Sequence, residues 1–193
     1  MGLERRGRPL DAQRDALIHA ETLKQMGEVG YDSLSVERVA KKAGVSKATI
    51  YRRYPNKMEM VLSSLEQTAI RPPMPDTGNG LDDLRLMAKL ILTYALNDRG
   101  RCMFGCMMLA ASRHPELAQA MRKRVVGPRR ARGREVLERA IDRGELPPNT
   151  PLELVLDMIF GALFIRHARG DRVHESHAMA LVDAVWVGMG GRL

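Results

Sequence analysis

Residues 44–57, with the sequence GVSKATIYRRYPNK, combine cationic and hydroxyl side chains and contain no acidic residue. Lysine and arginine can donate hydrogen bonds to guanine O6 and N7, and threonine can offer a methyl group to thymine or a hydroxyl group to phosphate. This set of side chains could therefore read the major groove of DNA. It could equally form the solvated face of an ordinary helix, and the elements that position it decide between the two.

Two short helices joined by a tight turn are predicted around this stretch. Ser35 is a good N-cap for a first helix that runs through Ala43. Gly44 permits the turn, and Ser46 caps a second helix that Pro55 ends. This is the helix-turn-helix arrangement, in which the second helix enters a major groove. The residues expected to point outward from that helix are Lys47, Ala48, Thr49, Arg52 and Arg53.

Helical spacing of apolar residues extends on both sides of this motif. Residues 1–10 are basic and read as a flexible arm, and a first helix is predicted over 11–26. Gly27 and Gly30 are expected to end that helix. Asn56 begins a further helix in an arrangement like a capping box, with an acidic residue three positions on.

The Pro- and Gly-rich segment 71–80 is the best domain boundary in the chain. We therefore predict an all-α protein with a DNA-binding domain over 1–70, whose helix-turn-helix lies at about 35–54, and a helical bundle over 81–193. The helices expected in the bundle lie at about 81–97, 101–112, 115–143, 151–168 and 175–188, the third kinked or split at Gly127-Pro128.

The composition narrows the class of protein. The chain of 193 residues carries a net charge of +8, which favours contact with a polyanion, either nucleic acid or anionic lipid. Two cysteines, with no visible signal peptide or membrane span, lead us to expect a cytoplasmic protein. No nucleophile elbow, HExxH motif, phosphate-binding Gly loop or paired acids are present, so no catalytic residue, cofactor or metal site is expected.

Residues 30–61 resemble the tetracycline-repressor (TetR) family of bacterial transcription regulators. Tyr54 is a mild departure, because phenylalanine is commoner there. The positions that carry the resemblance are Gly30-Tyr31, Ser35, Val39-Ala40, Ala43-Gly44-Val45-Ser46, Thr49-Ile50-Tyr51, Tyr54, Lys57 and Met60.

The resemblance implies a role for each matched polar residue. Tyr51 would contact the sugar-phosphate backbone, and Lys57 would contact a phosphate. Ser35 and Ser46 would cap their helices and could bind phosphate. The residues that would face base edges are Lys47, Ala48, Thr49 and Arg52.

The basic arm suggests a second contact with DNA. Short cationic arms insert arginine into the narrow minor groove of A/T-rich DNA. Arg6 and Arg8 would be the residues that do so here. The alternative is a disordered tail that gives only non-specific attraction.

Members of this family are ligand-gated homodimers, and the resemblance implies the same here. The predicted helices 151–168 and 175–188 are more apolar than one bundle face requires, so they could form a four-helix interface with their twofold mates. The alternative is an ordinary buried helix pair in a monomer. The residues predicted at the interface are Ile159, Leu163, Leu181, Ala184 and Val185.

The expected ligand pocket lies among the first helices of the bundle. The chain has 13 methionines, and methionine suits an adaptable apolar cavity for an apolar or aromatic effector. These residues could instead be plain core. Cys102 and Cys106 are expected to pack rather than to sense metal or redox state. The predicted pocket residues are Met87, Tyr94, Met103, Phe104, Met107, Met108 and Phe164.

The sequence therefore favours a homodimeric repressor that binds a pseudo-palindromic operator and is released by a small ligand. One alternative is a ligand-independent architectural DNA-binding protein that uses the arm and the basic run 122–134, although such a run usually pairs with acids. Another is a helical protein that binds a membrane surface or a partner; the favoured reading involves no membrane.

Overall fold

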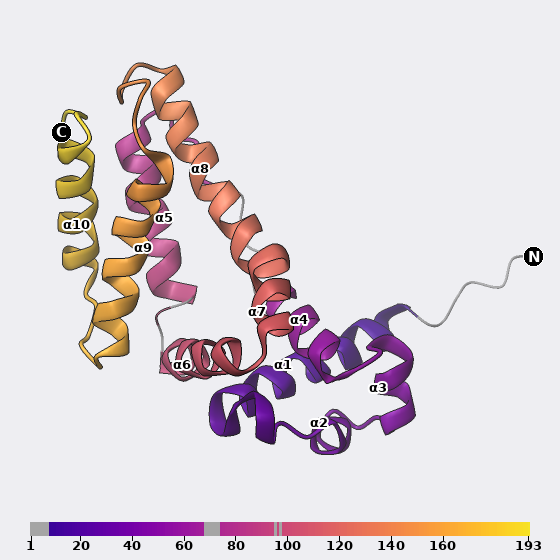
Figure 1. Ribbon diagram of the computed structural model, residues 1–193. Helices are drawn as coiled ribbons and strands as arrows, with labels where there is room; N and C mark the ends of the chain where they lie inside the picture. The colour runs from indigo at the N-terminus through magenta and orange to yellow at the C-terminus, as the bar shows by residue number, and fades with distance from the viewer. Residues whose placement is uncertain (1–7, 68–73, 95, 97) are drawn as a thin grey trace, which may run out of the picture. The chain divides into compact units, whose positions relative to one another are not determined.

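The computed structural model describes residues 8–67, 74–94, 96 and 98–193, and within them the side chains of 8–11, 94 and 98–104 are not described. The described residues form helices joined by turns and contain no strand, so the predicted all-α class is confirmed (Figure 1). They pack as two compact units. Unit 1 comprises the chain to Arg71 together with Gly105–Val125, and unit 2 comprises Pro72–Phe104 and Val126–Leu193.

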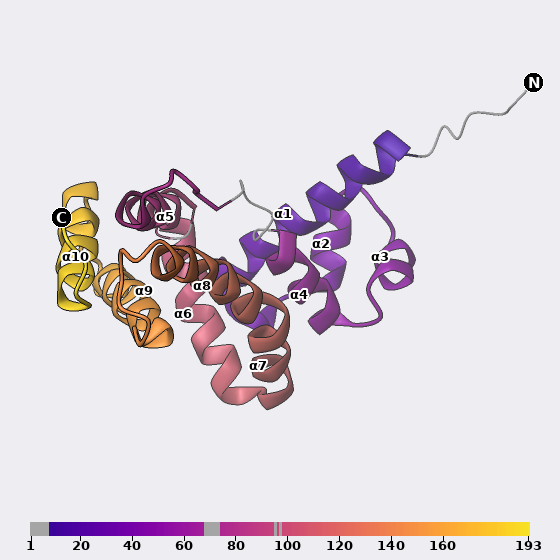
Figure 2. The ribbon, with the colours of Figure 1, turned by 90° about the horizontal axis from the view of Figure 1, so that it is seen from above.

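Unit 1 holds the predicted helix-turn-helix. The four N-terminal helices of the chain lie next to one another in Figure 2. The end of α6 (Asp98–Arg113), α7 (Pro115–Met121) and a π-helical turn at Arg122–Val126 complete the unit. The four N-terminal helices are α1 (Arg8–Ser33), α2 (Val36–Lys42), α3 (Lys47–Arg53) and α4 (Lys57–Gln67).

Side-chain caps fix where the short helices begin. Ser35 Oγ accepts a hydrogen bond from the Arg38 N–H at 3.3 Å, and Ser46 Oγ accepts one from the Thr49 N–H at 3.1 Å. Each bond satisfies a backbone donor that the first helical turn leaves unpaired. Between the two helices Gly44 has a φ of 68°, a conformation that glycine adopts at little cost. The predicted caps and turn are confirmed.

Helix α1 is longer than predicted. It begins at Arg8 rather than at residue 11, and it continues through Gly27 to a break at Gly30, where φ is 76°. A glycine inside a helix costs about 1 kcal/mol relative to alanine. Packing of α1 against α2 and α4 offsets this cost, with Ile18 and Met26 fully buried.

The predicted helix 115–143 is split. Helix α7 is followed by the π-helical turn Arg122–Val126 and then by α8 (Gly127–Asp142). Pro128 has no N–H to donate to the carbonyl four residues earlier, and a local π-type turn is a common way to accommodate such a defect. The split predicted at Gly127-Pro128 is therefore confirmed.

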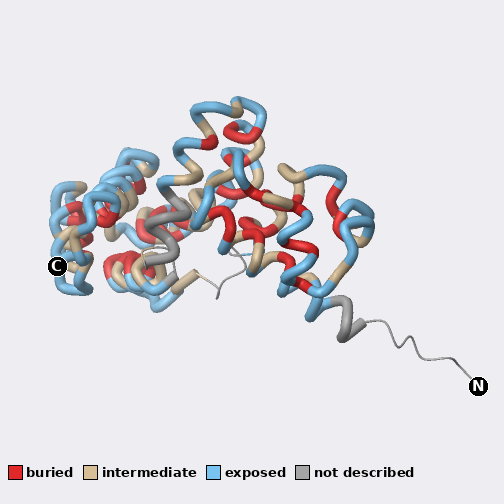
Figure 3. The backbone as a smooth tube through the Cα atoms, turned by 90° about the horizontal axis from the view of Figure 1, so that it is seen from below, coloured by how far each residue is buried: buried red, intermediate tan, exposed pale blue. Residues whose placement is uncertain are grey.

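Unit 2 is a bundle of four helices: α5 (Gly80–Tyr94), α8, α9 (Leu152–Ala168) and α10 (Glu175–Gly188). Helix α10 packs against α5 and α9, and α8 packs against the same two helices. Buried positions recur along one side of each helix, as Figure 3 shows. No helix among the described residues is both long enough and apolar enough to cross a membrane.

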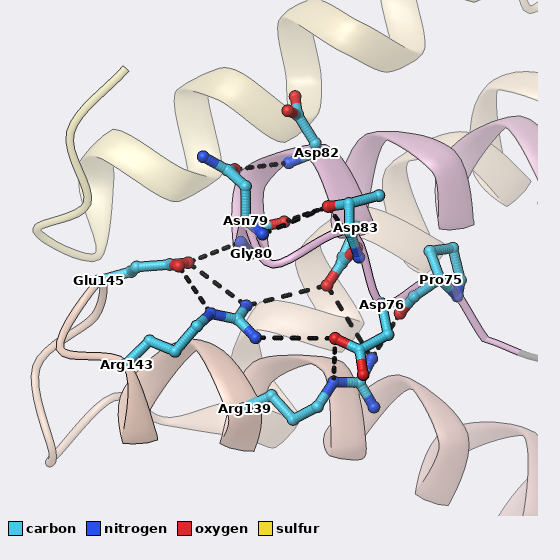
Figure 4. A network of polar contacts seen from close by, with 10 residues as sticks. Pro75, Asp76, Asn79, Gly80, Asp82, Asp83, Arg139, Arg143 and Glu145 are labelled. Carbon is cyan, nitrogen blue, oxygen red and sulfur yellow. Dashed lines mark hydrogen bonds and ion pairs between the residues drawn. The ribbon is translucent and has the colours of Figure 1, made fainter.

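A buried carboxylate joins two helices of unit 2 (Figure 4). Asp83, in the first turn of α5, is fully buried and accepts hydrogen bonds from the Thr77 N–H at 2.7 Å and the Thr77 hydroxyl at 2.8 Å. Arg139 and Arg143 of α8 place guanidinium nitrogens 3.9 and 3.8 Å from its other oxygen. A buried charge is tolerated only with such partners, so this network fixes the start of α5 against α8.

Replacing Gly80 with alanine should destabilise unit 2. A Cβ at this position would lie 2.5 Å from Ala140 Cβ and 2.9 Å from the Trp186 ring, so the packing must shift. Overpacking of this kind costs about 1–3 kcal/mol. Urea unfolding should show a correspondingly lower free energy of unfolding. Gly105→Ala is the matched control, because no heavy atom lies within 4 Å of the added Cβ and its stability should not fall. Equal stability of Gly80→Ala and wild type would contradict the packing described.

Acidification should destabilise the protein through His19, which lies between Tyr54 and Ser64. Its Nδ1 is 3.0 Å from Ser64 Oγ, its ring packs edge-on against Tyr54, and burial lowers its pKa below the ordinary 6.5. The unfolded chain therefore takes up a proton first as the pH falls below about 6.5, and stability that is complete above this pH is then lost.

Thermal unfolding measured between about pH 7.5 and 5.5 should show this loss. The pH dependence should be weaker in His19→Gln than in wild type, whereas His177→Gln, at an exposed position of α10, should keep it. An unchanged pH dependence in His19→Gln would count against this assignment.

Candidate nucleic-acid interface

One side of helix α3 packs against the rest of unit 1, and the other side is exposed to solvent. Ile50 is 1% exposed, and Tyr54, the C-cap, is 8% exposed with its hydroxyl 3.4 Å from His19 Nε2. These two residues fix α3 to the unit. The residues on the open side are Lys47, Ala48, Tyr51 and Arg52, which are exposed, and Thr49, which is half-buried.

Arg52 is the freest cation of this open side. It is exposed, and no hydrogen bond or ion pair joins it to another described residue. Tyr51, one position earlier, keeps 43% of its surface exposed. Arg52 can therefore reach a ligand without first breaking a contact to another described residue.

Lys47 and Thr49 are held by neighbours in the helix-turn-helix. The Lys47 ammonium forms an ion pair with Glu37 of α2 and lies 5.7 Å from the centre of the Tyr51 ring. The hydrogen bond to Glu37 raises the pKa of Lys47, and the same bond lowers the pKa of Glu37. Thr49 Oγ1 lies 2.9 Å from the cap oxygen of Ser46. Lys47 and Thr49, which are predicted to contact bases, are thus oriented by contacts to α2 or to the cap.

Arg53 does not point outward with the other cations. Its guanidinium lies 3.1 Å from a carboxylate oxygen of Asp15 in α1, and only 19% of its side chain is exposed. The prediction of an outward-facing Arg53 is therefore wrong. Asp15 lies far away in the sequence, and the packing of α1 brings the two residues together.

Lys57 is engaged at the end of α1. Its ammonium donates to the backbone carbonyl oxygens of Tyr31 at 2.9 Å and Asp32 at 3.2 Å, and it lies 4.6 Å from the centre of the Tyr31 ring. These bonds satisfy carbonyls that the end of the helix leaves free. A contact between Lys57 and phosphate stays a prediction, with one of three ammonium donors left for it.

Two further cations lie at the end of the first helix of the helix-turn-helix. Lys41 and Lys42 occupy the last turn of α2, directly before the turn to α3, and both are exposed. Neither side chain forms a hydrogen bond or ion pair with another described residue. Sequence reasoning overlooked them, although a cationic pair immediately before Ala43-Gly44 is itself a usable signal. The predicted arm residues lie outside this description: Arg6 is not described, and Arg8 is described only as the first residue of α1.

Three arginines of the basic run 122–134 pair with acidic residues of their own unit. In unit 1, Arg124 lies 2.7 Å from Glu59 and 2.6 Å from Glu66. In unit 2, Arg130 and Arg134 both pair with Glu153. The expected pairing with acids is present, although the partners lie on other helices rather than on α8 itself.

The predicted dimer-interface residues fall on two different faces. Ile159, Leu163 and Val185 are 0%, 2% and 3% exposed in the core of unit 2, so they cannot contact a second copy without unfolding. Leu181 is half-buried and Ala184 is exposed. Helix α9 is apolar on every side, and its sequence did not distinguish the inner face from the outer one.

The predicted pocket residues are likewise dispersed. Met87 belongs to the core of unit 2, Met107 and Phe164 are half-buried, and Met108 is 58% exposed. The side chains of Tyr94, Met103, Phe104 and Cys102 lie outside the described residues, and Cys106 is half-buried. Across the described residues, no group of three His, Cys, Asp or Glu side chains could hold a metal ion.

Comparison with known proteins gives the same assignment for both parts of the chain. Residues 18–63 match the family described as "Bacterial regulatory proteins, tetR family", and residues 74–185 match "Tetracyclin repressor-like, C-terminal domain". The HTH-type transcriptional regulator YdeS of Bacillus subtilis (strain 168) is 33% identical over 187 residues, which cover 96% of this chain and 94% of that protein.

Two further relatives agree. The DNA-binding transcriptional repressor TetR of Mycobacteroides abscessus is 28% identical over 179 residues, covering 89% of this chain and 91% of that protein. The crystal structure of the TetR family transcription regulator SCO0332 superposes with a TM-score of 0.69 at 27% identity, covering 91% of this chain and 98% of that one.

These relatives are regulators rather than enzymes, so the prediction of a non-enzymatic protein is confirmed. The capped, anchored α3 with its open cationic side is the element that such regulators place on DNA. The chain therefore belongs to the TetR family of DNA-binding transcriptional regulators.

Proposed function

We propose that this regulator is a homodimeric repressor that binds a pseudo-palindromic operator in the bacterial cytoplasm and leaves it when a small ligand binds. The observation that carries the proposal is the open side of α3, where exposed readers stand on a helix anchored by Ile50 and Tyr54. The Mycobacteroides abscessus relative, which is named a transcriptional repressor, supports repression rather than activation.

The proposed DNA-contacting residues form two groups, those that contact bases and those that contact the sugar-phosphate backbone. Arg52 and Lys47 can donate to guanine O6 and N7, and Thr49 can present its methyl group to thymine. Tyr51, together with Lys41 and Lys42, supplies contacts to the sugar-phosphate backbone, which set the register without reading sequence. One such helix reads only a half-site, so two copies are needed for an operator.

The surface proposed for dimerisation is the outer face of α9 and α10. On α9, Leu154, Met158 and Ile165 are 51%, 38% and 61% exposed, and on α10 Val187 is 48% exposed. Exposed small residues between them would let two backbones approach closely. We call this set the α9–α10 stripe: Leu154, Met158, Gly161, Ala162, Ile165, Ala180, Ala184, Val187 and Gly188.

The stripe has the features of a surface that is buried in a protein–protein interface. Its members recur three or four residues apart, so they form one continuous band on each helix. An open hollow of about 220 Å³ beside the band is lined by Ala162, Ile165 and Leu181 among others. Contiguous apolar surface of this kind marks an interaction site, and a twofold pairing of α9 and α10 would bury it as a four-helix interface.

The ligand is proposed to be a small apolar or aromatic molecule bound by the helical bundle. Support comes from the methionine-rich composition, because methionine side chains adapt to irregular apolar guests. Within the bundle, the candidate lining group with a half-buried side chain is Phe164. Binding would favour a conformation in which the two copies of α3 no longer match the operator.

The architectural alternative finds less support. It relied on the arm and on the basic run 122–134, and the carboxylates of Glu59, Glu66 and Glu153 already pair with three arginines of that run. This pairing withdraws three of the seven cations of the run from contact with a DNA backbone.

Replacing Arg52 with alanine should reduce discrimination between DNA sequences. Genomic footprinting with the wild-type protein first identifies the operator, and fluorescence anisotropy then compares the operator with random DNA. Loss of one specific base contact in each half-site should weaken operator binding by about 30-fold or more and change random-sequence binding much less.

Arg172→Ala is the charge-matched control for this experiment, because Arg172 is an exposed cation in the turn between α9 and α10. It should leave the ratio of operator to random binding unchanged. An unaltered ratio in Arg52→Ala would remove Arg52 from the set of readers.

Replacing Ile165 with glutamate should convert the dimer into a monomer, because pairing would then bury a carboxylate without a partner. Sedimentation velocity at micromolar concentration should give 21.6 kDa for the variant and twice that mass for wild type. Ile165 is 61% exposed in the single chain, so circular dichroism should show an intact fold. Arg172→Glu, outside the stripe, should remain dimeric. A monomeric wild type, or a dimeric Ile165→Glu, would contradict this interface.

A further inference from the structure

An ion pair joins the two helices of the motif at the edge of the reading surface. Glu37, in the first turn of α2, contacts the ammonium of Lys47, the first residue of α3. Both side chains are well exposed, at 63% for Glu37 and 50% for Lys47. The pair therefore lies where DNA would approach, and it places a negative charge beside a predicted reader.

The carboxylate of Glu37 is held in place by the cap of its own helix. Ser35 Oγ donates to Glu37 Oε2 at 3.2 Å while also accepting the N–H of Arg38. The neighbouring cation Arg38 is turned to Glu28 of α1, at 3.6 Å, so it leaves Glu37 to Lys47. The low pKa of Glu37 and the high pKa of Lys47 agree with a pair that is ionised on both sides at neutral pH.

Phosphates and base edges make different demands on this pair. A phosphate is an anion, so a lysine that binds it while keeping Glu37 would bring two negative charges close together. The lysine must then leave Glu37 to make the contact. Guanine O6 and N7 are neutral acceptors, and an ammonium with three donors can bind them while it retains its carboxylate partner.

We propose that Glu37 is a specificity-determining residue, which withholds Lys47 from DNA phosphates and leaves it available to a base edge. The inference rests on the proposed operator binding and adds a role for a residue that touches no base itself. Glu37 weakens binding to random DNA, which depends almost entirely on phosphate contacts, more than it weakens binding to the operator.

Four proteins test the proposal: wild type, Glu37→Gln, Lys47→Gln and the double variant. Anisotropy titrations measure the affinity of each for the operator and for a random duplex over a range of KCl concentrations. Glu37→Gln should bind random DNA about two- to fivefold more tightly, the size expected when an exposed ion pair is released. Its salt dependence on random DNA should steepen by about 1.8, corresponding to one added phosphate contact in each subunit of the proposed dimer. Operator affinity should change by less, so the ratio of operator to random binding should fall.

The Lys47→Gln background separates this mechanism from simple repulsion between Glu37 and DNA. If Glu37 acts through Lys47, adding Glu37→Gln to Lys47→Gln should change neither affinity. An equal gain in both backgrounds would show that the carboxylate repels DNA directly, and it would overturn the proposal. A selective loss of operator binding in Glu37→Gln would also overturn it, because Glu37 would then position Lys47 rather than withhold it.

Glu116→Gln is the matched control, since Glu116 is an exposed carboxylate of the same unit that pairs with His114 rather than with Arg38 or Lys47. It should leave the specificity ratio unchanged. Failure of the proposed function is distinguishable, because wild type would then show no preference for any operator. A wild type that prefers its operator, with no coupling between positions 37 and 47, would reject the present inference alone.

Discussion

The burial of Ile50 and Tyr54 is the constraint on which the reading surface depends. Helix α3 has seven residues and would not be stable in isolation, because so short a helix does not recover the cost of its nucleation. Its conformation comes from the caps and from these two anchors against unit 1. The buried anchors and the proposed DNA-contacting residues alternate around the same two turns, so a loosened anchor would displace all of the proposed base contacts at once.

Contacts that act within a few residues could be predicted from the sequence. Ser35, Gly44 and Ser46 work on backbone groups of their own turn, and helical spacing located the remaining helices to within a few residues. The partners of long charged side chains could not be predicted. Arg53 reaches Asp15 and Lys57 reaches the end of α1 only because α1 packs beside the motif, and no local pattern encodes that packing.

The bundle illustrates a second limit of sequence reasoning. Helix α9 is apolar on all sides, so periodicity cannot say which residues face the core of the chain. The structure assigns Ile159 and Leu163 to the inside and leaves Leu154 and Ile165 outside. Helix α10 is almost as uniform, and Val185 was misplaced for the same reason. Amphipathic helices such as α5 present no such ambiguity.

The separation of the α9–α10 stripe from α3 has a genetic consequence. The stripe belongs to unit 2 and the readers belong to unit 1, so a mutation in α3 leaves the pairing surface intact. If two copies pair through the stripe, a subunit with a defective α3 still pairs with a wild-type subunit. The resulting heterodimer carries a single functional recognition helix. Defects in α3 would then be dominant over a wild-type allele, whereas defects in the stripe would be recessive.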